Sequence, residues 1–248
     1  MKKLLLILLL TFQSFWAQTA FDQGNKLYEK ENYEAAISSY ESVVNSGKQS
    51  AELYFNLGNC YYKLHKVAPA IYNYEKALLL SPNDTEIKTN LEFARKMTID
   101  DIKVIPKVGF NKLIQDFTAT YYYDTWAWIA VAFAFLFLLF FVGYYFSLSA
   151  VLKRIFFLGM FLWLIGIVLS AASGFYEKGR MDNERPAIVF AETASVKSEP
   201  KGAATDAFVL HEGTKVYILE SIANWKKVEL TDETTGWIDE SAIKEIKN

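Results

Sequence analysis

The sequence predicts a multidomain membrane protein: an all-α repeat stack, then a two-helix transmembrane hairpin, then a small all-β barrel. A repeat with a period of 34 residues fills the first third of the chain. Two long apolar runs without a charged side chain follow, and short β-prone runs broken by turns fill the last part. Because helical repeats, membrane spans and strands occupy different stretches, we expect separate domains.

The composition narrows the range of functions. The chain has 248 residues, a net charge of −2 and one cysteine, Cys60. Near-neutral charge gives no electrostatic reason to expect nucleic-acid binding. Cys60 and His65 would lie in a repeat helix and the turn after it, and His211 is remote in the sequence. This dispersed set suits neither a nucleophilic pair nor a zinc site, so we expect no enzyme, no cofactor and no metal.

Residues 1–18 are typical of a secretory signal peptide. Lys2 and Lys3 precede an apolar run over residues 4–10, which is too short to span a bilayer, and a more polar stretch follows. We therefore expect the residues that come next to be exported.

The repeat occupies residues 19–99. Its recurring pairs are Gly24-Asn25 and Gly58-Asn59, Ala36-Ile37 and Ala70-Ile71, and Tyr40-Glu41 and Tyr74-Glu75. A period of 34 residues is the signature of tetratricopeptide repeats, in which small residues let two helices approach closely. A third helix over residues 84–97 would cover the exposed end of the stack.

The first helix of each such repeat lines a concave face, which gives candidate protein-binding residues. They are Phe21, Asn25, Tyr28, Phe55, Asn59 and Tyr62. The alternative is an ordinary repeat surface, but exposed aromatic side chains without a partner are a liability. The repeat subtype that clamps a terminal carboxylate needs cations where Phe21, Glu86 and Asn90 stand, so we do not expect that clamp.

Residues 100–124 form a linker before the membrane. Within it, Phe110, Leu113, Ile114 and Phe117 have the spacing of an amphipathic helix. Such a helix would either lie in the membrane interface or pack on the repeats.

Residues 125–146 and 155–175 are the expected transmembrane helices, because each run is long enough to cross a hydrocarbon core. A buried hairpin in a soluble protein is the alternative, but the first run has no polar face to meet water. Lys153 and Arg154 in the turn over residues 147–154 place that turn in the cytoplasm and both flanks in the periplasm. The predicted location is thus the inner membrane.

Small residues share one face of the second apolar run. They are Gly159, Gly166, Ser170 and Ser173. This face would pack against the first membrane helix or contact another membrane protein. Neither run contains an ionisable residue, which argues against a transporter, a channel or a proton relay.

After a linker over residues 176–185, residues 186–248 change to short β-prone runs that suggest a small antiparallel barrel. The stretch from Phe208 to Val216, with Gly213-Thr214 at its turn, resembles bacterial SH3 domains. In that family two tryptophans pack at or near the core and groove. Trp225 and Trp237 are therefore further candidate protein-binding residues.

The order of signal, repeats, two membrane helices and SH3-like domain resembles BatE-type members of the Bat aerotolerance operon family. The resemblance implies an inner-membrane protein that works beside von Willebrand A-domain membrane proteins and a MoxR-type ATPase, in tolerance of oxygen or envelope stress. Two hypotheses remain open. One is a scaffold that holds protein partners at the membrane; the other is a cell-wall sensor whose SH3-like domain binds peptidoglycan.

Overall fold

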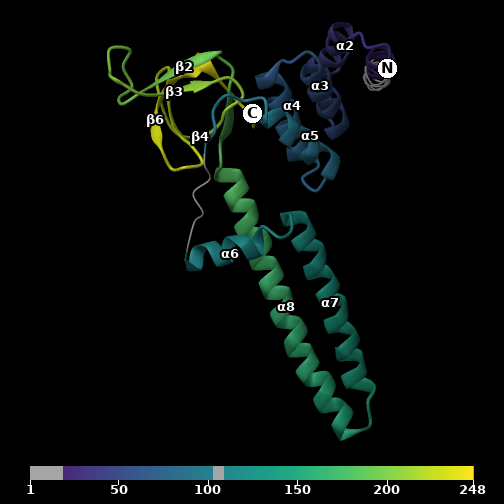
Figure 1. Cartoon of the computed structure of the whole chain (residues 1–248). Helices are drawn as coiled ribbons and strands as arrows, with labels where there is room; N and C mark the ends of the chain where they lie inside the picture. The colour runs from purple at the N-terminus through teal and green to yellow at the C-terminus, as the bar shows by residue number, and fades with distance from the viewer. Residues whose placement is uncertain (1–18, 103–108, 248) are drawn as a thin grey trace, which may run out of the picture. The chain divides into compact units, whose positions relative to one another are not determined.

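The computed structural model describes residues 19–102 and 109–247 (Figure 1). The expected signal peptide over residues 1–18 lies outside the described residues. The chain divides into two compact units. The repeat–sheet unit holds described residues 19–102 and 185–247, and the hairpin unit holds described residues 109–184.

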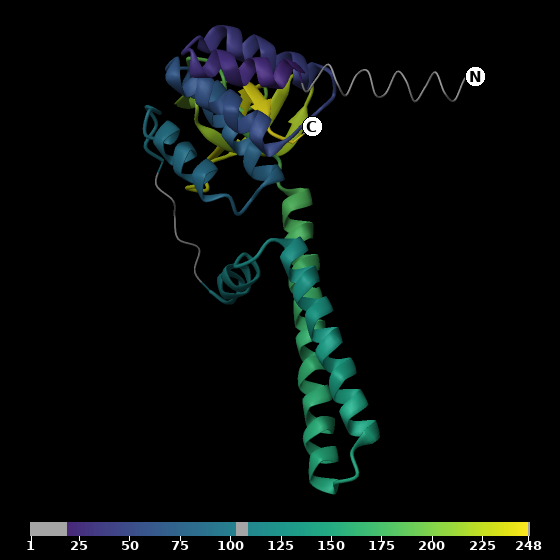
Figure 2. The ribbon, with the colours of Figure 1, turned by 90° about the vertical axis from the view of Figure 1, so that its right-hand side faces the viewer.

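The repeat–sheet unit begins with a helical stack. A helix over residues 19–29 is followed by α2 (Tyr33–Asn45), α3 (Ala51–Lys63), α4 (Val67–Leu80) and α5 (Thr85–Arg95). Side chains of Asn32, Ser50 and Asp84 accept backbone amides at the starts of α2, α3 and α5, which satisfies donors that have no partner inside the helix. The expected repeat stack is confirmed, and Figure 2 shows its helices lying side by side.

Two glycines explain why the helices of each repeat pack so closely. A Cβ atom built on Gly58 would lie 2.6 Å from the Tyr74 ring, and one on Gly24 would collide with the Tyr40 ring. Tyr40 and Tyr74 are the largest fully buried side chains of the stack. In each repeat, a glycine on the first helix therefore leaves the space that a tyrosine side chain of the second helix fills.

The second part of the unit is one antiparallel sheet. Its strands are β1 (Pro186–Val189), β2 (Thr193–Lys197), β3 (Asp206–His211), β4 (Lys215–Ile222), β5 (Trp225–Glu229), β6 (Thr235–Asp239) and β7 (Ile243–Glu245), in the order β3-β2-β6-β5-β4-β1-β7, with the 3-10 turn η1 (Glu240–Ala242) before β7. Val196, Val216 and Ile238 lie in its core, fully buried.

The sheet is open, whereas the sequence predicts a closed barrel. The strand pairings end at β3 on one side and β7 on the other, so they do not close. β7 has only three residues and pairs with β1 alone, and β3 buries only Leu210. Too little backbone and too little apolar surface remain at these two ends to close the ring.

The sheet packs on the repeats instead of standing apart from them. Ile188 and Ile246 of the sheet are buried in the same core as α4, and the Phe190 ring meets the Tyr72 ring at 5.6 Å. Gly213 contacts the same helix through a backbone with φ of +86°. The sheet thus keeps a hydrophobic core of its own and adds a few apolar side chains to the core of the repeats.

The hairpin unit consists of α6 (Phe110–Thr118), α7 (Tyr123–Phe146) and α8 (Ala150–Asn183). Both α7 and α8 are long and apolar enough to cross a membrane, with peak mean hydropathy of 2.4 and 2.5. The most apolar windows are 0% and 11% buried, whereas the core helix of a soluble protein is mostly buried. The two helices run antiparallel in Figure 1.

The small-residue face of α8 packs against α7. Built Cβ atoms on Gly159 and Gly166 would strike the rings of Phe140 and Phe133 respectively. Of the two alternatives for this face, the structure therefore shows contact with the first apolar helix. Aromatic rings pack against glycines in the hairpin, as they do in the repeats.

The α8 helix continues beyond its apolar stretch. Residues 176–183, which the sequence analysis assigns to a linker, are helical. Arg180 forms ion pairs with Glu177, three residues before it, and with Glu184, four residues after it, the latter at 2.8 Å. Ion pairs at this spacing stabilise a helix in the absence of apolar contacts.

Candidate protein-binding groove

A repeated pattern of side-chain amides runs along the helices that open each repeat. The oxygen Oδ1 of Asn25 accepts hydrogen bonds from the Tyr40 hydroxyl at 2.7 Å and from Asn56 Nδ2 at 3.1 Å. One repeat later, Asn59 Oδ1 accepts from the Tyr74 hydroxyl at 2.7 Å and from Asn90 Nδ2 at 3.0 Å. We call these four asparagines the amide ladder.

The amide ladder has both a structural and a chemical consequence. The oxygens of Asn25 and Asn59 bind the stack together, so these two residues do more than line a surface. The NH2 groups of Asn25 and Asn59 and the oxygens of Asn56 and Asn90 take no part in these four bonds. Such amide groups match the hydrogen-bonding needs of an extended peptide backbone.

Sequence reasoning placed Asn25 and Asn59 in the candidate site but missed the ladder as a unit. Asn56 is not among the predicted groove residues, and Asn90 enters the sequence analysis only as a departure from a carboxylate clamp. The signal was present, because each partner lies 31 residues after the asparagine that it bonds. The tyrosines that complete the ladder recur with the repeat.

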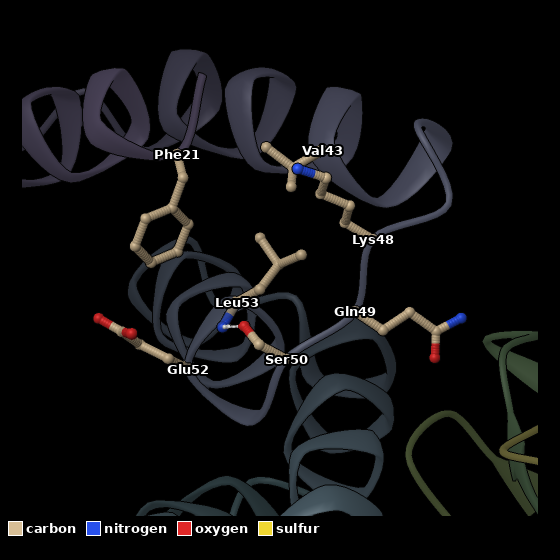
Figure 3. Close-up of a pocket in the computed structure, with 7 residues that line it drawn as sticks. All are labelled: Phe21, Val43, Lys48, Gln49, Ser50, Glu52 and Leu53. Atoms are coloured by element: carbon tan, nitrogen blue, oxygen red, sulfur yellow. Dashed lines mark hydrogen bonds between the residues drawn. The ribbon is translucent and has the colours of Figure 1, made fainter. Parts of the chain in front are cut away.

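Two hollows lie on the repeats, and the second is lined in part by Asn59 and Asn90 of the ladder. The first has a volume of about 250 Å3 and lies between the helix over residues 19–29, the end of α2 and the start of α3. Figure 3 shows Phe21 and Leu53 pointing into it, with the Ser50 hydroxyl bonded to the Leu53 amide at 3.1 Å. Its lining residues are Phe21, Val43, Lys48, Gln49, Ser50, Glu52 and Leu53.

The second hollow, of about 280 Å3, is built from all three groove helices. Its lining residues are Tyr28, Asn59, Tyr62, Lys63, Glu86, Asn90 and Phe93. Phe93 is 49% exposed although it is aromatic, and sequence reasoning did not select it. The Tyr28 hydroxyl has a pKa raised by burial and then by Cys60 and Tyr33, so it stays protonated and can donate a hydrogen bond.

The structure brings together four of the six predicted groove residues in these hollows. Phe21 lines the first, and Tyr28, Asn59 and Tyr62 line the second. Asn25 and Phe55 line neither. Asn25 belongs to the amide ladder, and the half-buried Phe55 ring lies 5.9 Å from the Tyr74 ring.

The two predicted tryptophans lie in the sheet, away from both hollows. Trp225 begins β5 and is half-buried, and Trp237 in β6 is 9% exposed. Trp237 pairs with Lys227, two residues after Trp225, so the register puts both rings on one face of the sheet.

A buried carboxylate joins the repeats to the sheet. Glu75 of α4 accepts from Lys215 of β4 at 2.8 Å and from Arg95 of α5 at 2.7 Å. Burial raises the pKa of this carboxyl, but the two cations outweigh burial and hold the pKa below its ordinary value. Glu75 is therefore an anion that ties three elements together.

A second carboxylate closes the same interface from the start of the linker. Asp100 accepts the His211 backbone amide at 2.7 Å, bonds His211 Nδ1 at 2.7 Å and accepts the Thr214 hydroxyl at 2.6 Å. Burial raises the pKa of Asp100, but these hydrogen bonds lower the pKa by more than burial raises it. The pKa of Asp100 is therefore below its ordinary value. Nothing in the local sequence pattern pointed to Glu75 or Asp100.

The nucleophile candidate considered from the sequence is chemically inert. Cys60 is fully buried in α3, and burial raises the pKa of its thiol to about 12. The thiol is thus protonated at neutral pH and inaccessible. Within residues 19–102 and 109–247, no group of three or more histidine, cysteine or acidic residues could hold a metal ion.

The repeats define the class of this protein. The tetratricopeptide repeat family matches residues 51–84, and a related repeat family matches residues 24–65. The chain thus contains tetratricopeptide repeats, which indicate a scaffold for protein–protein interaction.

Curated relatives are similar to part of this chain. Dynein axonemal assembly factor 4 of Rattus norvegicus is 42% identical over 62 residues, which cover 25% of this chain and 15% of that protein. The same factor from Pongo pygmaeus is 41% identical over 66 residues, or 26% of this chain and 16% of the relative. Sperm-associated antigen 1 of Rattus norvegicus is 30% identical over 79 residues, which cover 32% of this chain and 9% of that protein. The chain spans less than a fifth of the length of each of these relatives.

Proposed function

We propose that this protein is a non-enzymatic membrane scaffold whose repeat groove binds an extended segment of a protein partner. The amide ladder carries the proposal, because it presents donors and acceptors at the repeat period along the groove. The hollow lined by Asn59 and Asn90 of the ladder, and the further hollow at Phe21, offer space for side chains of the bound segment. Aromatic anchors such as Tyr62 and Phe93 are the residue types that dominate protein interfaces.

The proposed location is the inner membrane, with the repeat–sheet unit in the periplasm. The length and hydropathy of α7 and α8 support a two-pass anchor. Lys153 and Arg154 at the start of α8 support a cytoplasmic turn. The resemblance to the Bat family extends the proposal to a complex with von Willebrand A-domain membrane proteins and a MoxR-type ATPase.

Truncating two groove tyrosines tests this function. We expect Tyr28→Ala with Tyr62→Ala to reduce co-purification of membrane partners at least several-fold, because both rings line the second hollow. Loss of interface aromatics costs about 2 kcal/mol of binding, whereas loss of partly exposed rings changes stability by about 0.5 kcal/mol. The measurement is quantitative co-purification of the full chain from native membranes, with circular dichroism of the purified variant.

The matched control is Leu219→Ala with Ile222→Ala, two exposed apolar residues of β4 that lie outside the groove. It should retain all partners. A folded tyrosine variant that also retains all partners would exclude the groove as the binding surface. The face of the sheet with Trp225 and Trp237 would then become the candidate, and retention of the full chain on purified peptidoglycan would test the cell-wall alternative.

A further inference from the structure

The α6 helix has a sharply divided surface. Leu113 is 66% exposed and Phe117 is 55% exposed, and they lie four positions apart, so they are on one side of the helix. The sequence puts Ile114 on the same side. Lys112, Gln115 and Asp116 fall on the other side. Two large apolar side chains are thus exposed on a helix whose other face is polar.

A buried tryptophan fixes α6 to the start of α7. The Trp126 indole NH donates to the Thr118 carbonyl at the end of α6, at 2.8 Å, and Trp126 is 6% exposed. The rings of Phe117 and Tyr121 pack on Trp126 at 5.3 and 5.4 Å. Only residues 119–122 separate the two helices. α6 is therefore held at the level of the first turn of α7.

We propose that α6 lies in the headgroup region of the bilayer, with Leu113 and Phe117 inserted toward the acyl chains. This inference rests on the proposed membrane location of α7 and α8. If α7 spans the membrane, its first turn marks the interface, and the Trp126–Thr118 bond holds α6 there. Figures 1 and 2 show α6 running across the hairpin rather than along it, which is the orientation of an interfacial helix.

Lipid is the occupant because the apolar face continues an apolar surface. Trp128, at the first turns of α7, is 73% exposed, and Tyr121 is 45% exposed. Aromatic residues of this kind concentrate at the depth of lipid headgroups. Trp128 lies two positions after Trp126, on which the Phe117 ring packs, so the exposed apolar side chains of α6 and of the first turns of α7 lie at one level and a single bilayer boundary would cover both.

Site-directed spin labelling tests the depth of α6. Single cysteines replace Leu113, Phe117, Asp116 or Leu138 in the full chain, which is reconstituted in vesicles of phosphatidylethanolamine and phosphatidylglycerol. Native Cys60 is buried with a raised pKa, so unsubstituted protein should take up no label. The measurement is the accessibility of each label to oxygen, which partitions into lipid, and to a water-soluble nickel complex.

We expect labels at 113 and 117 to be several-fold less accessible to nickel than the label at the exposed Asp116, and to lie between that label and the label at Leu138 on α7 in their ratio of oxygen to nickel accessibility. Because 113 and 117 are labelled separately, a folding defect in one variant leaves the other informative. A label at 138 in lipid with 113 and 117 in water would overturn the inference and leave the membrane anchor intact. A label at 138 in water would overturn both.

Discussion

Replacing Glu75 with alanine is expected to lower the free energy of unfolding of the repeat–sheet unit by about 3 kcal/mol, because Lys215 then loses its partner at a partly buried site. Glu75 is buried and is bonded from two elements that lie far apart in the sequence. Thermal unfolding of the full chain in detergent, followed by tryptophan fluorescence, measures the change.

The matched control is Glu41→Ala. Glu41 occupies the same position one repeat earlier, is exposed, and accepts only the Tyr61 hydroxyl, at 2.7 Å, among the bonds seen for it. We expect its loss to cost less than about 1 kcal/mol. Equal effects of the two substitutions would show that Glu75 does not join the sheet to the repeats.

The Glu75 effect should also depend on pH. Because its folded-state pKa is lowered, its contribution is complete above the ordinary carboxyl pKa of about 4 and is lost as pH falls through the lowered value. The same sign holds for Asp100, whose pKa is also lowered. The difference between the Glu75→Ala variant and the unsubstituted protein should therefore be constant near neutral pH and should shrink in acid.

The second large effect is expected at Gly213. Its φ of +86° disfavours any side chain, and a Cβ atom there would lie 2.8 Å from Val67 and 2.9 Å from Thr98. We expect Gly213→Ala to cost about 2–4 kcal/mol, from backbone strain together with overpacking. The sheet should also loosen from the repeats, which hydrogen exchange at Ile188 and Ile246 would detect.

Gly47→Ala separates the two causes. Gly47 has a similar φ of +82°, but nothing lies within 4 Å of the position that its Cβ would take. Its substitution should cost only the backbone strain, about 1–2 kcal/mol. If both alanine variants lost the same stability, close packing of Gly213 on the repeats would not contribute.

Local sequence patterns predicted most of the fold because the forces that build it are local or periodic. Glycine and tyrosine recur at the repeat period and pack on each other. The apolar runs of α7 and α8 are continuous, so their helical type is readable without any tertiary contact, although α8 extends beyond its apolar run at both ends. The sequence did not predict that β3 and β7 remain the unpaired edges of the sheet. The β propensity of a segment does not show which other strand it pairs with.

The docking of the sheet on the repeats could not be predicted in this way. Its polar contacts join Glu75 to Lys215 and Asp100 to Thr214 across more than a hundred residues. Neither carboxylate differs in its local setting from a solvated surface charge. The candidate groove was partly predictable. The repeat positions identified Tyr28, Asn59 and Tyr62, whereas the exposure of Phe93 depends on how α5 packs against the second repeat.

Photo-crosslinking from the groove in native membranes tests the central claim most directly. A benzophenone amino acid replaces Tyr62 or Phe93, which line the second hollow, or Lys88, which is exposed on α5 and does not line it. We expect the same discrete protein adducts from positions 62 and 93, and none from 88. Adducts from 88 as strong as those from the groove, or none from a folded protein at 62 and 93, would contradict the assignment of this groove as the partner-binding surface.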